Sequence, residues 1–109
     1  MIQEEDNLRI DKWLWAVRIY KTRSQASEAC KKGRILIEDV QVKPSRIIKK
    51  GEIVFVKIPP ITYQYKVLGL LGKRQSAKII VDYVEDITPE EEKVKLDMKR
   101  FSGFEIRDR

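Results

Sequence analysis

An apolar stripe near the N-terminus constrains the fold more than any other feature of the sequence. It repeats at the three- and four-residue spacing of one helix face and consists of Ile10, Trp13, Leu14, Val17 and Tyr20. We therefore predict a first helix over residues 10–20 with this stripe in the core. Trp15 lies about 200° around the helix from Trp13. We expect the C-terminal part of the chain to cover Trp15, and stacking on a nucleic-acid base is the alternative.

A second helix is predicted to follow almost at once. Thr22 is a candidate N-cap with Gln25 three residues later, which is the spacing of a capping box. Gly33 suits the left-handed position that follows a helix. Only about two residues separate the helices, so they should form a tight corner. Cys30 is expected to be a buried small residue between them.

The rest of the chain reads as strands and one last helix. We predict a hairpin over 35–42 that turns at Glu38-Asp39, and a strand over 53–58 that ends at Pro59-Pro60. Beyond it we predict strands over 62–71 and 77–86, and a helix capped by Thr88 with Val94, Met98 and Phe101 facing inward.

The fold class predicted from these elements is α+β, with two N-terminal helices packed on a small, bent, mostly antiparallel sheet. A short β-plus-helix extension should follow at the C-terminus. We divide the chain into a first unit over 9–58 and an extension over 59–109.

Positive charge is concentrated in one segment. The 109-residue chain has a net charge of +6, but residues 9–50 contain twelve basic and four acidic residues, a net charge of +8. The remaining residues contain eleven basic and thirteen acidic ones, a net charge of −2. A charge needed only for solubility has no reason to gather in this way, so the pattern favours a polyanionic partner, most often nucleic acid.

The composition argues against several kinds of chemistry. Histidine is absent and Cys30 is the single cysteine, so we expect no zinc site, no Ser-His or Cys-His pair and no cofactor. A polar, acidic N-terminus and the lack of a long apolar run suggest a cytoplasmic protein with no membrane partner. The stretch GLLGKR at 69–74 could be a phosphate-contacting basic hairpin; a specific backbone clamp is a weaker reading.

Four short motifs occur in a characteristic order: RIDKWLW (9–15), R-x-x-KTR-x-x-A (18–26), GRI (33–35) and VKPS (42–45). Together they resemble an S-four-type RNA-binding domain, the alpha-L RNA-binding motif. The DKWLW and KTR blocks and the short extension are more specifically similar to the heat shock protein 15 family.

This resemblance implies a set of RNA-binding residues. Carried over to matching positions, they are Arg9, Lys12, Arg18, Lys21, Thr22, Arg23, Ser24, Lys32, Arg34, Lys43, Pro44 and Ser45. The physical reading agrees for the start of the second helix, because a helix N-terminus flanked by Lys21 and Arg23 is a natural phosphate site. The acidic Glu38-Asp39 turn is expected to lie off the RNA. Many members of that family end in a strongly basic tail, whereas residues 102–109 here read SGFEIRDR, with two basic and two acidic residues.

The resemblance also implies a non-enzymatic factor that binds structured ribosomal RNA on the large ribosomal subunit, with tRNA as a further candidate ligand. Such factors act in the recycling or rescue of subunits that carry a nascent chain on tRNA. We expect a monomer. Two other readings stay open at this point: a protein-interaction module, and an accessory fragment of an RNA-modifying enzyme.

Overall fold

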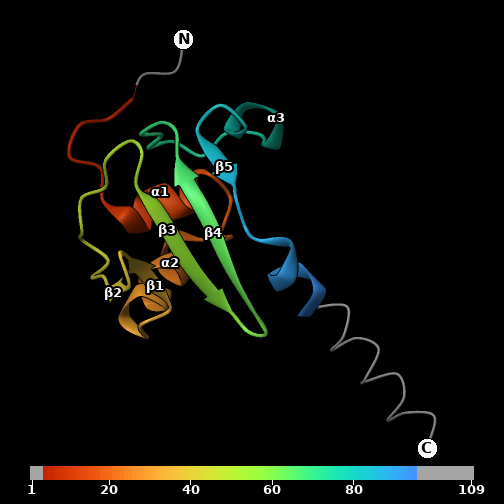
Figure 1. Cartoon of the computed structure of the whole chain (residues 1–109). Helices are drawn as coiled ribbons and strands as arrows, with labels where there is room; N and C mark the ends of the chain where they lie inside the picture. The colour runs from red at the N-terminus through yellow and green to blue at the C-terminus, as the bar shows by residue number, and fades with distance from the viewer. Residues whose placement is uncertain (1–3, 96–109) are drawn as a thin grey trace, which may run out of the picture.

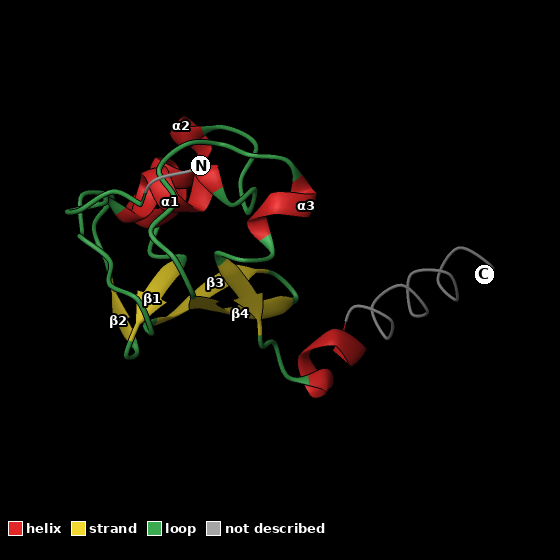
Figure 2. Ribbon diagram, turned by 90° about the horizontal axis from the view of Figure 1, so that it is seen from above, coloured by secondary structure: helices red, strands yellow, loops and turns green. Residues whose placement is uncertain are grey.

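The computed structural model describes residues 4–95 and has two layers (Figure 1). One layer is a single antiparallel sheet with the strand order β2-β1-β3-β4-β5. Helices α1 and α2 lie on one side of this sheet (Figure 2), which confirms the predicted α+β class. The elements in chain order are α1 (Ile10–Ala16), α2 (Arg23–Lys31), β1 (Ile35–Ile37), β2 (Val40–Gln41), β3 (Ile53–Ile58), β4 (Ile61–Val67), α3 (Ala77–Ile80) and β5 (Val84–Asp86).

The core lies between the helices and the inner face of the sheet. Val54 and Val56 of β3 are fully buried there, and the pairing register places Tyr65 and Tyr63 of β4 directly opposite them. The predicted stripe supplies the helical side of the core, because Ile10, Trp13, Leu14 and Val17 are all buried. Burying each aliphatic side chain of this kind contributes roughly 1.5–3 kcal/mol.

Helix α1 ends at Ala16, so the prediction of a helix to residue 20 was wrong. Arg18 adopts a left-handed backbone with φ +66°. The Arg18 N–H donates to the Trp15 carbonyl (3.1 Å) and the Ile19 N–H donates to the Leu14 carbonyl (3.0 Å). This pair of bonds is a Schellman motif. The stripe misled because Val17 and Tyr20 still pack on the core after the helix has ended.

Helix α2 has the ends that the sequence predicts. The Thr22 hydroxyl accepts from the Gln25 N–H at 3.0 Å, and Gly33 has φ +74°. A second Schellman motif closes the helix, with the Arg34 N–H donating to the Ala29 carbonyl. Cys30 is buried as expected. Burial, with the nearby charge of Asp11, raises the pKa of the Cys30 thiol to about 11.

The hairpin turn at Glu38-Asp39 is also confirmed. Both residues have positive φ, and β1 pairs with β2 on either side of them. The division of the chain at residue 58 stays a prediction. The backbone itself carries one sheet across that point, since β3 and β4 pair from Ile53–Lys66 to Ile58–Ile61.

The C-terminal half differs from prediction in two places. The predicted strand over 62–71 ends at Val67, and the predicted strand over 77–86 is instead the short helix α3 followed by β5. A short apolar run suits a helix or a strand equally well, and here the Ile80 N–H bonds back to the Ser76 carbonyl. Ile80 packs on the core and Val81 faces outward.

The last helix begins at residue 90, but Thr88 does not cap it. The Thr88 hydroxyl instead accepts from the Gln64 N–H on β4 at 2.9 Å, and Glu92 Oε1 accepts from the Thr62 N–H at 2.9 Å. Val94 is 44% exposed, so the prediction that it faces inward was wrong. Met98 and Phe101 lie outside the described residues.

Residues 69–75, which we call the 69–75 segment, are hydrogen-bonded to α1 and to the chain before it. Trp13 Nε1 donates to the Gly69 carbonyl at 3.0 Å, and Arg18 Nε donates to the Gln75 carbonyl at 2.6 Å. Arg74 Nη1 donates to two carbonyls at the end of α1, those of Trp15 (2.7 Å) and Tyr20 (2.9 Å). The segment therefore completes the end of α1.

These contacts change the interpretation of two sequence features. The guanidinium of Arg74 is used inside the protein, so this arginine of the GLLGKR stretch is not presented to a phosphate. The side chain of Trp15 is partly buried against the core, which favours the expected cover over open stacking.

Candidate nucleic-acid interface

A buried carboxylate lies at the centre of the candidate site. Asp11 is only 3% exposed, at the start of α1. It accepts two hydrogen bonds from Arg9, from Nε to Oδ1 at 3.2 Å and from Nη2 to Oδ2 at 3.0 Å. Arg23 Nη2, from the first residue of α2, lies 3.6 Å from Oδ1. Asp11 therefore positions two of the predicted RNA-binding arginines, whose side chains each remain 45% exposed.

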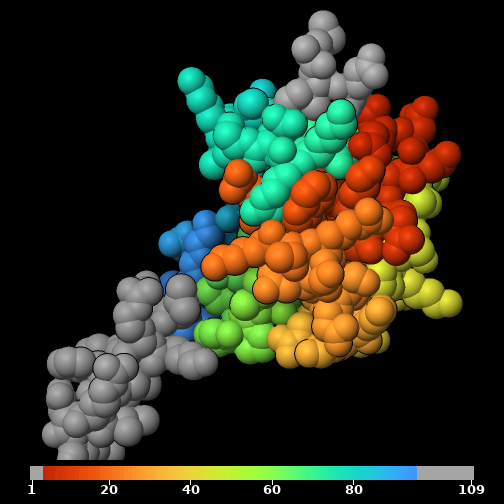
Figure 3. Space-filling view, turned by 180° about the vertical axis from the view of Figure 1, so that it is seen from behind, coloured from red at the N-terminus to blue at the C-terminus, as the bar shows by residue number. Residues whose placement is uncertain are grey.

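The predicted loop residues Lys43, Pro44 and Ser45 lie at the same place. The Asp11 N–H donates to the Pro44 carbonyl at 3.3 Å, which holds the loop against the start of α1. We define the Asp11 corner as Arg9, Asp11, Arg23, Lys43, Pro44 and Ser45. Three segments distant in sequence thus meet at one surface, and Figure 3 shows the loop in yellow beside the orange helix α2.

The first turn of α2 extends the Asp11 corner. Lys21, Thr22 and Ser24 are exposed with Arg23 at this helix start. The Thr22 hydroxyl already accepts a hydrogen bond from the Gln25 N–H. The start of a helix with cations beside it nevertheless attracts phosphate. These four predicted residues therefore lie together.

Two predicted residues lie away from the Asp11 corner and are bonded to other segments of the chain, although Arg18 remains exposed. Lys12 Nζ is 2.8 Å from Glu5 Oε1 in the segment before α1. Arg18 lies just after the end of α1, where its Nε donates to the Gln75 carbonyl. Because α1 ends at Ala16, Arg18 is not one helical turn before Lys21, as the longer predicted helix required.

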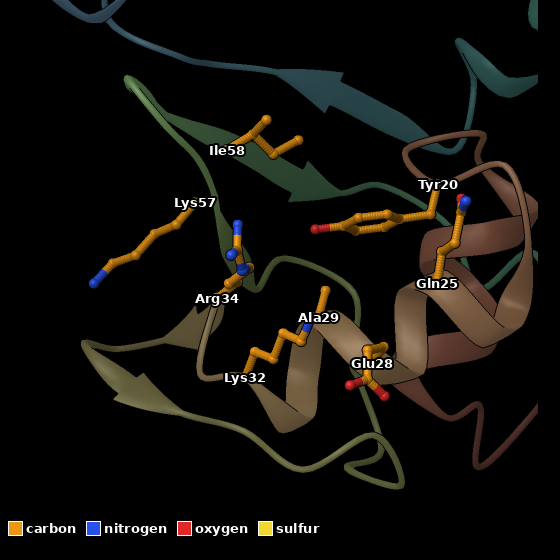
Figure 4. Close-up of a pocket in the computed structure, with 8 residues that line it drawn as sticks. All are labelled: Tyr20, Gln25, Glu28, Ala29, Lys32, Arg34, Lys57 and Ile58. Atoms are coloured by element: carbon orange, nitrogen blue, oxygen red, sulfur yellow. The ribbon is translucent and has the colours of Figure 1, made fainter.

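The last two predicted residues, Lys32 and Arg34, line a separate pocket at the end of α2. We call it the Tyr20 pocket; its volume is about 380 Å³, and Tyr20 and Lys57 also line it (Figure 4). The neighbouring Lys31 instead shares a shallow hollow with Lys43 and Pro44. Lys31 and Lys32 are adjacent at the end of α2, but their side chains lie at two different surfaces.

Sequence reasoning missed three residues of these surfaces. Asp11 could have been noticed as an acid placed between Arg9 and Lys12 in a strongly basic segment. The position of Lys31 beside Lys43 could have been predicted only if the orientation of α2 had been known. Lys57 has no sequence signal, because the pairing of β1 with β3 and the bond from its N–H to the Arg34 carbonyl (2.8 Å) bring it to the Tyr20 pocket.

Some other kinds of site are not seen in the described part of the chain. Within residues 4–95 no three side chains of the metal-binding types gather in one place. No helix in that range is long and apolar enough to cross a bilayer.

Comparison with known proteins identifies the family of the chain. The family model described as S4 domain matches residues 8–54, which include the whole Asp11 corner. The heat shock protein 15 homolog of Haemophilus influenzae is 33% identical over 73 residues, covering 67% of this chain and 56% of that protein. The chain spans about half the length of the heat shock protein 15 homologs that it matches in this way.

A shorter relative is covered more fully. The RQC P-site tRNA stabilizing factor of Listeria innocua is 32% identical over 72 residues, covering 64% of this chain and 78% of that factor. The fold is similar to the trimeric structure of Vibrio cholerae heat shock protein 15, with a TM-score of 0.73 at 23% identity over 87% of this chain and 94% of that one. The chain therefore belongs to the S4-domain family that includes heat shock protein 15 and the RQC P-site tRNA stabilizing factors.

Proposed function

We propose that this protein is a non-enzymatic RNA-binding factor of the ribosome. The observation that carries the proposal is the Asp11 corner, where a buried carboxylate holds Arg9 and Arg23 in place beside the exposed Lys43. A surface of fixed cations and hydroxyls suits phosphates and 2′-hydroxyl groups, which is how folded RNA is recognised by shape.

The finer proposal concerns the target. We infer binding to structured ribosomal RNA of the large subunit, and to tRNA there, in the recycling or rescue of subunits that carry a nascent chain. The names of the relatives support this inference, since one group stabilizes P-site tRNA and the other consists of heat shock proteins. We further infer that the protein acts in the cytoplasm as a monomer.

The test is cosedimentation of the purified chain with isolated large ribosomal subunits. We expect the wild type to travel with the subunits and Arg23→Glu to remain at the top of the gradient. Lys78→Glu is the matched control, because it makes the same charge change at an exposed position on α3, outside both basic surfaces. Equal binding by all three proteins would exclude the Asp11 corner as the interface.

Salt dependence provides a second measurement. If about five phosphates are neutralised, the logarithm of the binding constant should fall with the logarithm of salt concentration at a slope of about −3.5 to −4.5. A flat dependence would contradict electrostatic RNA binding.

A protein-interaction role is the second candidate, and one observation favours it. Leu68, Val81 and Val94 are exposed apolar side chains in the C-terminal half. Nuclease treatment before cosedimentation separates the two roles: association that survives digestion of the RNA supports a protein partner, and association that is lost supports RNA.

A further inference from the structure

The Tyr20 pocket is built by three elements that the backbone holds together. Lys32 is the C-cap of α2, Arg34 precedes β1, and Lys57 lies near the end of β3. The Lys57 N–H donates to the Arg34 carbonyl at 2.8 Å, and this hydrogen bond holds the two residues side by side. In Figure 4 the Arg34 guanidinium lies opposite the hydroxyl end of Tyr20, and Lys57 starts at the edge of the pocket with its side chain extending outward.

The charge of this pocket is largely uncompensated. Three cations and one carboxylate, Glu28, line it. Within residues 4–95 no ion pair joins Lys32, Arg34 or Lys57 to a carboxylate, whereas Arg9 and Arg23 of the Asp11 corner are both paired with Asp11. The pocket therefore has an excess of positive charge that attracts an anion.

The pocket also has an apolar wall with an unused polar group. Ala29, Ile58 and the ring of Tyr20 form this wall. The Tyr20 hydroxyl is enclosed, and among the described residues it has no hydrogen-bond partner. An enclosed hydroxyl without a partner is unfavourable, and a ligand atom that accepts a hydrogen bond from it, once the side chains around it have moved aside, would remove that cost.

We propose that the Tyr20 pocket receives one unpaired nucleotide of the bound RNA. Its phosphate would lie among Lys32, Arg34 and Lys57, and its base would contact the Tyr20 ring and Ile58. A volume of about 380 Å³ lies at the small end of ligand pockets and fits one nucleotide rather than a helix. This inference rests on the proposed RNA-binding function and adds a preference for RNA with an extruded base next to a helix.

The experiment compares two hairpin RNAs with the same stem, one of which has a single bulged nucleotide. Fluorescence anisotropy measures both dissociation constants for the full chain. We expect the wild type to bind the bulged hairpin about fivefold more tightly, since contact between a base and an aromatic ring is favourable. Lys57→Glu should abolish that preference, and Tyr20→Phe should reduce it because only the hydroxyl is lost. Lys78→Glu should retain it.

The outcomes separate the two proposals. Equal binding of both hairpins by the wild type overturns the inference and leaves the proposed function standing. A preference that persists in Lys57→Glu also overturns it, because the bulge must then be recognised elsewhere. Failure to bind either hairpin removes the inference and the RNA-binding proposal together. Circular dichroism of each variant checks that the exposed Lys57 and the half-buried Tyr20 can be changed without loss of the fold.

Discussion

The Asp11 corner and the 69–75 segment both contain arginines, but these arginines have different kinds of partner. Arg9 and Arg23 are positioned by a carboxylate and remain partly exposed. Arg74 donates to two backbone carbonyls at the end of α1, and Arg18 donates to the Gln75 carbonyl. The carboxylate of Asp11 holds its two arginines beside the exposed start of α2, whereas the backbone carbonyls direct Arg74 and Arg18 to the contact between α1 and the 69–75 segment. Net charge alone does not distinguish the two regions.

The largest expected effect is the loss of stability when Arg74 is replaced by alanine. The change leaves the carbonyls of Trp15 and Tyr20 without their charged donor and should lower the free energy of unfolding by about 2 kcal/mol. Urea denaturation measures this. Lys73→Ala is the matched control, an exposed neighbour expected to change stability by less than about 0.5 kcal/mol. Equal changes in the free energy of unfolding for the two substitutions would show that the Arg74 side chain does not stabilise the end of α1.

A second prediction compares the two regions by RNA binding. Arg23→Ala should weaken binding to large ribosomal subunits about tenfold, the effect of losing one charge-assisted contact of about 1.4 kcal/mol. Arg18→Ala removes the same charge but should weaken binding less than about twofold, since Arg18 bonds to Gln75. Filter binding under identical salt measures both. The reverse ranking would return Arg18 to the interface, as the sequence resemblance implied.

A third prediction separates positioning from charge. Asp11→Asn raises the net charge by one, so simple electrostatics predicts tighter RNA binding. We expect binding about threefold weaker instead, because the neutral amide no longer holds Arg9 and Arg23 as the carboxylate does. Binding isotherms at one salt concentration decide the sign, and tighter binding would contradict a positioning role for Asp11.

The smallest expected effect concerns Glu4, which binds the 69–75 segment. Its hydrogen bond from the Leu70 N–H and its bond to Lys50 lower the Glu4 pKa. The folded state therefore binds fewer protons at this group, so the stabilisation is present above pH 4.5, the ordinary pKa, and is lost as the pH falls through the lower folded value. Glu4→Gln should cost about 0.5 kcal/mol at pH 7 after solvent screening.

Thermal unfolding at several pH values tests this prediction. The stability difference between wild type and Glu4→Gln should shrink as the solution is acidified below pH 4.5. A difference that does not change with pH would show that the Glu4 charge contributes nothing and that only its size or its neutral hydrogen bonding matters.

Local signals in the sequence were sufficient for α2, because its cap and its glycine act within a few residues. They were not sufficient for the end of α1, where the donor to the last carbonyls is Arg74, more than fifty residues away. The pattern also predicted a strand over 77–86, where packing of Ile80 selects a helical turn. At the candidate site, the resemblance predicted the exposed basic residues. It did not predict Asp11 and Lys57, because their roles depend on tertiary contacts that cannot be deduced from the spacing of residues in the sequence.

The contacts of Thr88 and Glu92 have a consequence for solubility. Strand β5 pairs with only the last three residues of β4, so the N–H groups of Thr62 and Gln64 would otherwise form an open sheet edge. Side-chain oxygens of Glu92 and Thr88 occupy these two donors. An open edge can recruit a strand from another molecule and begin aggregation. Here two side chains close that edge without adding a sixth strand, and they protect the protein against self-association through it.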